Sequence, residues 1–388
     1  MFRRRYTEIS RKRWYDVIYL SLIALVPRFG RILLAHQKEL VEGFYWATGT
    51  FVLMLSLYFL INELTHRHRQ AFVSAAVLGS MQGIIYLDGI DLSQLWSYAL
   101  LTGCIYYGIR AFRRYGSQWK DMLAWASLLA ASILLGGIWP LYNYAMPFAI
   151  VSLIALRPIM RYKKWSLPVM SLVTLLLISI PFLLHPEQFV PALQHEIDGW
   201  LSQDGVGRLL DPLKWLFFFF IISETGLWLI IGMVAVCYSL RSQRIHGDPA
   251  GQISAWWLIL MCVLLMLRPA FDHDWKMALL VPISCCIGSY FNLLSLPNRI
   301  NRKDRRILRS SLAGTASMFL IISGMALLGW LYSIAYAIPF ISISIICAIG
   351  ILLLIWKKYH KKKLSIHFTE ISLIIFSILL AVSRCISL

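Results

Sequence analysis

The sequence has 388 residues, of which 59% are apolar and 14% are charged. Soluble domains carry roughly a quarter charged residues, so this composition excludes a water-soluble globular protein. The formal net charge of +18 suggests nucleic acid as a partner, but the Lys and Arg residues form short clusters between hydrophobic blocks. Because no surface of interleaved aromatic and basic residues follows from this arrangement, we expect no nucleic-acid partner.

The apolar residues lie in blocks of roughly twenty, the length that an α-helix needs to cross a hydrocarbon core about 30 Å thick. The predicted fold class is therefore all-α, a polytopic transmembrane helix bundle that forms a single domain over residues 1–388. We expect about thirteen spans (12–13), with boundaries good to a few residues. They cover 14–34, 44–62, 70–87, 93–112, 122–138, 141–156, 166–184, 214–238, 254–268, 276–296, 311–331, 334–356 and 367–386.

The basic residues predict the orientation of these spans. Cytoplasmic loops of membrane proteins are enriched in Lys and Arg, and a cytoplasmic N-terminus places 29 of the 37 basic residues in the tail and loops of that side. The other eight are Arg28, Arg31, Lys38, Arg208, Lys214, Arg268, Lys276 and Arg384. We therefore expect a multi-pass protein of the bacterial inner membrane, with functional polar groups on its outer side.

Tryptophans near the ends of the predicted spans favour the same boundaries. Trp46 and Trp96 fall near outer ends, and Trp14 and Trp119 near inner ends. Interfacial belts of membrane proteins are rich in Trp, so we interpret these residues as membrane anchors.

The first two outer loops contain carboxylates. Residues 27–44 include Arg28, Arg31, Glu39 and Glu42, and could equally form an interfacial connector. The second loop contains Asp88 and Asp91. These two carboxylates could share a divalent cation, which prefers oxygen ligands, or Asp91 could cap the next helix.

The longest outer loop spans residues 185–213 and contains His195 and Arg208. Its apolar residues recur at helical spacing at Val190, Leu193, Ile197 and Leu201. This pattern predicts an amphipathic helix on the outer interface, where it would shape a lipid-substrate site. A solvated charged face explains the same residues.

Arg268 and His273 belong to a dense cluster of ionisable residues in the short outer loop 268–276. Asp272, His273 and Asp274 are adjacent in sequence, so their side chains diverge and do not suit one metal ion. We favour a role for Arg268 or His273 in binding a substrate phosphate, with plain helix ends as the alternative.

Glu224 is a carboxylate deep in an apolar span (217–236). An ionisable residue inside a membrane helix is a functional hypothesis by default. Glu224 could carry a proton, pair with an Arg from an outer loop, or be protonated and hydrogen-bonded.

Two resemblances concern the middle of the chain. The segment 123–184 combines an Ala-Ser-Leu-Leu helix, Gly136-Gly137-Ile138-Trp139-Pro140, Arg157-Pro158 and Arg161-Tyr162-Lys163-Lys164-Trp165 with a span that ends near Pro181. It resembles an uncharacterised family of bacterial multi-spanning membrane proteins. With Asp88 before the fourth span, it also resembles the GT-C glycosyltransferases, which transfer sugars from polyprenyl-phosphate donors at the outer membrane face.

The GT-C resemblance implies roles for the outer carboxylates. One from the first loop, Glu39 or Glu42, and one from the second, Asp88 or Asp91, would serve as catalytic base and metal ligand, with Asp88 the expected ligand. The chain departs from the family in lacking an Asp-Glu doublet after the first span and a large soluble domain after the last.

These observations predict a transferase or polymerase acting on lipid-linked envelope glycans, whose partners are membrane lipid and a polyprenyl-phosphate-linked sugar. One alternative is a transporter or flippase with a midplane site at Glu224. The other is a non-catalytic membrane subunit of an envelope assembly.

Overall fold

The computed structural model describes residues 14–25, 37–81, 84, 92–113, 118–137, 140–145, 147–151, 228, 232, 235–240, 249–267 and 276–294. Within these ranges all regular structure is helical and no strand occurs. The predicted all-α fold class is confirmed for this part of the chain. The number of spans and the cytoplasmic N-terminus stay predictions.

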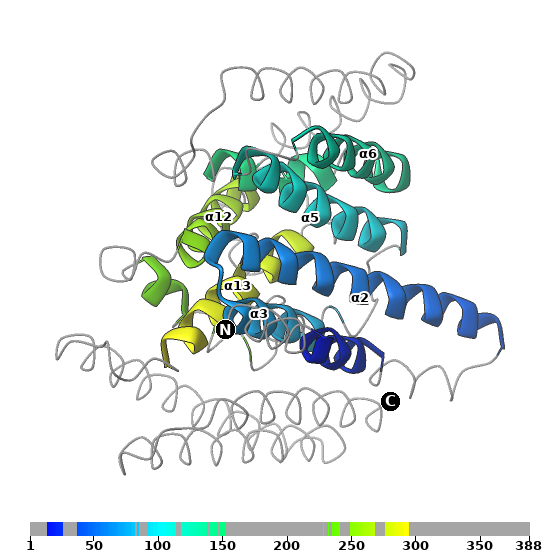
Figure 1. The fold of residues 1–388 in the computed structure, drawn as a ribbon, viewed down its shortest axis with the longest axis horizontal. Coiled ribbons are helices and arrows are strands. Elements are labelled where there is room, and N and C mark those ends of the chain that lie inside the picture. Colours follow the sequence, from blue (N-terminus) through cyan, green and yellow to red (C-terminus); the bar gives the residue numbers. More distant parts are fainter. Residues whose placement is uncertain are drawn as a thin grey trace, which may run out of the picture.

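Each described helix overlaps one of the predicted hydrophobic blocks, and Figure 1 shows how these helices are arranged. A first helical stretch covers Trp14–Leu25. The labelled elements are α2 (Gln37–Thr65), α3 (His68–Ser80), α5 (Leu92–Arg113), α6 (Gln118–Gly136), the π-helix η1 (Leu141–Ala145), α12 (Pro249–Leu267) and α13 (Lys276–Leu294).

Helix α2 begins at Gln37, seven residues before its predicted block, and two further elements also differ from the predicted blocks. Helix α3 ends at Ser80 rather than at residue 87, because the backbone of Met81 is extended (φ −67°, ψ 141°). The block 141–156 begins as the π-helix η1 rather than as a regular α-helix. Pro147 follows η1 and has no N–H, so it cannot donate to the carbonyl of residue 143 as an α-helical residue would.

Helices α2 and α5 run parallel and side by side. A Cβ atom on Gly49 would lie 3.1 Å from Trp96 Nε1, and one on Gly103 would lie 3.5 Å from Ser56 Oγ. The rings of Phe59 and Tyr106 are 5.8 Å apart. In each pair the α5 residue lies 47 positions after the α2 residue, and a constant offset of this kind defines parallel helices.

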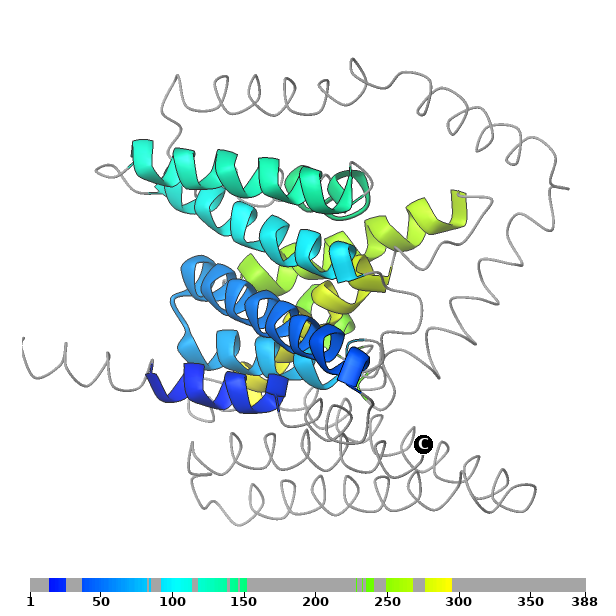
Figure 2. The same ribbon diagram turned by 90° about the vertical axis from the view of Figure 1, so that its right-hand side faces the viewer.

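Helices α5 and α6 run antiparallel. Ser97 Oγ lies 2.8 Å from Ser132 Oγ, while Arg110 Nε lies 3.3 Å from Asp121 Oδ1. Residue numbers therefore rise along α5 as they fall along α6. In both views α6, α5 and α2 follow one another, with α3 beyond α2 (Figures 1 and 2). Helices α2 and α5 are parallel, and α3 lies between them in the sequence. This is expected when a chain crosses one layer repeatedly, because every second helix then has the same direction.

Helices α3 and α13 are the most completely buried of the described helices and pack against each other. Every residue of α3 from Gln70 to Ser80 is buried, as is every residue of α13 from Met277 to Tyr290. The two helices touch at Gly288, where a Cβ atom would lie 2.8 Å from the carbonyl oxygen of Gln70 and 3.0 Å from the backbone nitrogen of Ser74. Only glycine allows this approach of the two backbones.

The outward surface of several helices is apolar. Trp14 is 70% exposed, Trp119 is 69% exposed and Leu134 is 86% exposed. Further exposed large apolar residues include Ile18, Leu22, Val41, Phe44, Leu123, Leu135, Ile150, Trp256 and Val263. Large apolar side chains exposed in this way are what contact with the hydrocarbon of a bilayer requires.

Among the described residues, one helix is long and apolar enough to cross a membrane alone, Gly43–Thr65 within α2. Trp14–Leu25, Pro249–Val263 and Met277–Asn292 are apolar but shorter. Trp14 and Trp119 are exposed, as lipid anchors must be. The prediction for Trp46 is wrong, because this side chain is buried in the protein core.

Candidate functional site

The beginnings of α2 and α5 lie at the same end of the bundle. Because the two helices are parallel with an offset of 47, Phe44 in α2 is level with residue 91, immediately before the first residue of α5, Leu92. This end is the one that the sequence predicts to face outward. It is where the chain enters from the first two predicted outer loops.

Glu39 and Glu42 lie in the first two turns of α2 and not in a loop. Helix α2 therefore begins within the predicted first outer loop, whereas its segment apolar enough to cross a membrane begins at Gly43, close to the predicted residue 44. The segment Gln37-Lys38-Glu39-Leu40 consists of good helix formers, and carboxylates near a helix N-terminus interact favourably with the helix dipole. The catalytic roles of Glu39 and Glu42 stay predictions.

Close contacts hold α5 and α6 together at this end. Ser97 Oγ lies 3.0 Å from the carbonyl oxygen of Ser132 and Ser132 Oγ lies 3.2 Å from that of Ser97. A Cβ atom on Gly136 would lie 2.5 Å from Ser97 Cβ. Small residues and paired hydroxyls thus bring the end of α6 against the start of α5, as is common where membrane helices pack tightly.

The other predicted site residues lie outside the described part of the chain. They are Arg28, Arg31, Asp88, Asp91, His195, Arg208, Glu224, Arg268 and His273. The loop 185–213 lies outside it too. Their roles stay predictions.

A buried cluster of polar and aromatic side chains surrounds η1, and the sequence interpretation did not identify it. Thr102 Oγ1 donates to the carbonyl oxygen of Tyr98 at 2.8 Å and lies 2.7 Å from the Tyr144 hydroxyl. Since threonine has one hydroxyl hydrogen, Tyr144 is the donor in the second bond. The Tyr144 ring also packs edge-on against Trp257, which packs against Phe148.

Two N–H donors of this region have no partner among the described residues. They are Asn143 Nδ2 in η1 and Trp257 Nε1 in α12, and both side chains are buried. A polar Asn inside the apolar block 141–156 was the signal in the sequence that could have drawn attention to this region. The tyrosines gave no such signal, because aromatic residues are common in membrane helices.

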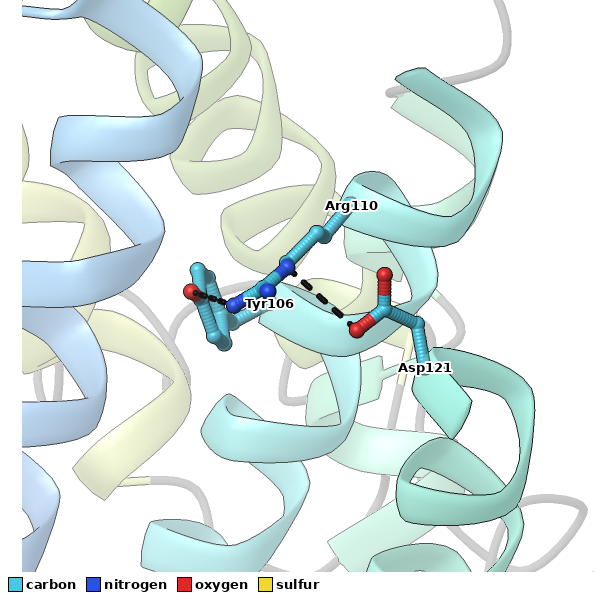
Figure 3. Close-up of polar contacts among 3 residues, drawn as sticks. All are labelled: Tyr106, Arg110 and Asp121. Atoms are coloured by element: carbon cyan, nitrogen blue, oxygen red, sulfur yellow. Dashed lines mark hydrogen bonds and ion pairs between the residues drawn. The ribbon is translucent and has the colours of Figure 1, made fainter. Parts of the chain in front are cut away.

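At the opposite end of α5, Arg110 joins Tyr106 and Asp121 (Figure 3). Arg110 Nη1 donates to the Tyr106 hydroxyl at 2.9 Å, and Arg110 Nε lies 3.3 Å from Asp121 Oδ1. Asp121 is buried, so Arg110 supplies the counter-charge that a buried carboxylate needs. The sequence interpretation treated Arg110 only as one of the cytoplasmic basic residues.

A metal site is not found in the described ranges, since no group of three or more His, Cys, Asp and Glu residues there could hold an ion. The predicted cation ligand, Asp88, lies outside those ranges. The cysteines at 104, 285 and 286 are buried and form no disulfide with one another, as expected of residues with a packing role.

Comparison with solved structures relates the chain by fold to ArnT. The crystal structure of ArnT from Cupriavidus metallidurans bound to undecaprenyl phosphate matches with a TM-score of 0.54 and 11% sequence identity, over 89% of this chain and 62% of ArnT. The apo oligosaccharyltransferase of Archaeoglobus fulgidus matches with a TM-score of 0.42 and 14% identity, over 70% of this chain and 43% of that chain. The second score is too low to support an argument.

No protein-family model and no curated protein matches the sequence. The resemblance to an uncharacterised bacterial family therefore gains no support, whereas the resemblance to GT-C glycosyltransferases is confirmed at the level of the fold. The chain shares the fold of ArnT and spans less than two thirds of the length of ArnT. Identity this low establishes the fold alone.

Proposed function

We propose that this protein is a GT-C-like transferase or polymerase of the bacterial inner membrane that acts on a polyprenyl-phosphate-linked sugar at the outer face. The observation that carries the proposal is the fold match to ArnT, a protein solved with undecaprenyl phosphate bound. The apolar outer surface of the helices, including Trp14, Trp119 and Leu134, supports a location in lipid.

The parallel register of α2 and α5 supports the position of the proposed site. Asp91 is bonded to Leu92, so its Cα lies about 3.8 Å from the start of α5. Phe44 of α2 is level with residue 91, and Glu42 lies two residues before Phe44, about 3 Å away along the α2 axis. Packed helices lie roughly 8–10 Å apart, so carboxylates from the two segments can reach one substrate.

In the proposed reaction a carboxylate from these segments accepts the proton of an acceptor hydroxyl, whose oxygen then attacks the anomeric carbon of the donor sugar. The bond between that carbon and the phosphate oxygen breaks, and polyprenyl phosphate leaves. A general base of this kind typically accelerates such a step about 10²- to 10⁴-fold. Arg28, Arg31 or Arg268 would offset the charge of the leaving phosphate, and Asp88 is the residue proposed to hold a divalent cation if one participates.

The test is the profile of lipid-linked glycans in a deletion strain that carries either the parent protein or a variant. Asp88→Asn, Asp91→Asn, Glu39→Gln and Glu42→Gln are the informative changes, and Asp304→Asn, a carboxylate of the predicted cytoplasmic side, is the matched control. The proposal expects at least one outer variant to reproduce the deletion profile at normal protein abundance. Parent-like profiles for all four would contradict it.

The same strains distinguish the transport alternative. A flippase leaves its lipid-linked substrate on the inner side unchanged in structure, whereas a transferase or polymerase alters the glycan. If Glu224→Gln abolishes function while the four outer variants are active, the functional site lies at Glu224 and the transport alternative is favoured.

A further inference from the structure

Arg110 is held in a fixed position at the corner between α5 and α6 (Figure 3). Its Nη1 donates to the Tyr106 hydroxyl at 2.9 Å, its Nε lies 3.3 Å from Asp121 Oδ1, and its guanidinium carbon is 5.9 Å from the centre of the Tyr106 ring. A guanidinium fixed on two sides loses little conformational freedom when it binds a further group. No described residue accepts a hydrogen bond from its remaining nitrogen, Nη2.

The exposure of the two charges differs. The Asp121 side chain is 4% exposed and that of Arg110 is 28% exposed, so the carboxylate is enclosed while part of the cation reaches the surface. The corner from residue 110 to residue 121 contains Arg110, Arg113, Arg114, Lys120 and Asp121 as its charged residues. Its net charge of +3 makes it a partner for an anion.

An apolar surface adjoins this charge. In the first turns of α6, Lys120 is exposed between Trp119, which is 69% exposed, and Leu123, which is 56% exposed. Trp119 and Leu123 are four residues apart and so share one side of the helix. Leu134 and Leu135 are exposed farther along the same helix. A ligand bound here would contact basic side chains at one end and the exposed apolar side chains of α6 at the other.

We infer that the α5–α6 corner binds an anionic phospholipid, with the phosphate against Arg110 and Lys120 and the acyl chains along the exposed side of α6. Arginine N–H groups match phosphate oxygens well, and basic residues near a membrane surface contribute roughly 1 kcal/mol each to binding of anionic lipid. The inference is independent of the transferase proposal, because it concerns the opposite end of α5.

The test is native mass spectrometry of the full protein, released from nanodiscs of phosphatidylethanolamine with increasing phosphatidylglycerol. Lys120→Gln removes one charge and leaves the Arg110–Asp121 ion pair intact. A loss of about 1 kcal/mol of binding free energy corresponds to phosphatidylglycerol retention about fivefold weaker. Arg110→Gln/Asp121→Asn removes the placed guanidinium while leaving the net charge unchanged. The matched control, Arg67→Gln, removes a cation from the connection between α2 and α3, at the same end of the bundle.

We expect K120Q and the double variant to retain less phosphatidylglycerol than the parent, and R67Q to retain as much. Parent-like retention by a folded double variant would overturn the inference, because bulk charge would then suffice. If the double variant does not fold, the comparison of K120Q with R67Q decides: equal retention by these two also overturns the inference. Activity on lipid-linked glycans plays no part in this readout.

Discussion

Trp96 of α5 packs on Gly49 of α2, where even a single added carbon would lie 3.1 Å from the indole nitrogen. This contact is the first of the series, with Ser56 and Gly103 and with Phe59 and Tyr106, that fixes α2 and α5 in parallel register. The register determines which chain segments meet at the end where both helices begin. The proposed site depends on it.

Engineered disulfides test the register. In a background with all seven cysteines replaced, Ser56→Cys/Gly103→Cys should oxidise readily, because a Cβ atom on residue 103 lies 3.5 Å from the position of Ser56 Oγ. The pair Ser56→Cys/Gly108→Cys is the control, since residue 108 lies about 7.5 Å farther along α5. Equal crosslinking of the two pairs, measured by gel shift, would show that the register is wrong.

Two glycines should respond oppositely to the same substitution. Gly288→Ala places a carbon 2.8 Å from the backbone oxygen of Gln70, whereas Gly103→Ala makes its nearest contact at an ordinary 3.4 Å. The backbone cannot yield as a side chain does, so G288A should lower the thermal unfolding temperature in detergent. G103A should be neutral or slightly stabilising, because alanine favours a helix by up to about 1 kcal/mol over glycine. Similar losses in both variants would argue against the close α3–α13 crossing.

The bond between Tyr144 and Thr102 predicts an asymmetry between two variants. Tyr144→Phe removes a donor and leaves Thr102 bonded to the carbonyl of Tyr98, so it should cost about 1 kcal/mol. Thr102→Val leaves the buried Tyr144 hydroxyl without its acceptor, which typically costs about 1–3 kcal/mol. Denaturant unfolding in micelles should therefore give T102V a lower free energy of unfolding than Y144F. The reverse order would contradict the assigned direction of the bond.

The Arg110–Asp121 pair should behave as a buried ion pair. Arg110→Gln removes the positive charge that Arg110 places against the enclosed Asp121 carboxylate, and breaking a buried ion pair usually costs about 3–5 kcal/mol. The 28% exposure of Arg110 places the expected loss at or below the lower end of that range. Adding Asp121→Asn should recover part of the lost stability. No recovery in the thermal unfolding temperature of the double variant would count against the pair.

Hydropathy sufficed to predict where helices lie, because the bilayer imposes the same length on every span. The predicted blocks 93–112 and 276–296 correspond closely to α5 and α13. Helix ends set by local chemistry were harder to predict. The early start of α2 at Gln37 and the π-helix at Leu141–Ala145 depend on the helix propensity of residues 37–40 and on Pro147, which a hydropathy average does not register.

Packing partners were not predictable from the sequence. Lipid is as apolar as a protein core, so hydrophobicity does not tell which side of a membrane helix faces protein. Trp46 illustrates this, because a tryptophan near a span end is typical of an interface yet here lies in the core. The pairing of Arg110 with Asp121 likewise could be recognised only in the structure, because both residues occur among other charged residues in the sequence.

The most direct test of a transferase is the reaction itself. Purified protein in nanodiscs, given the lipid-linked precursors extracted from the deletion strain, should release polyprenyl phosphate and form an extended or transferred glycan, both detectable by mass spectrometry. Asp88→Asn/Asp91→Asn should abolish the release while retaining the parent's unfolding temperature. Full release by this double variant, or none by the parent protein, would contradict the proposed site or the proposed activity, respectively.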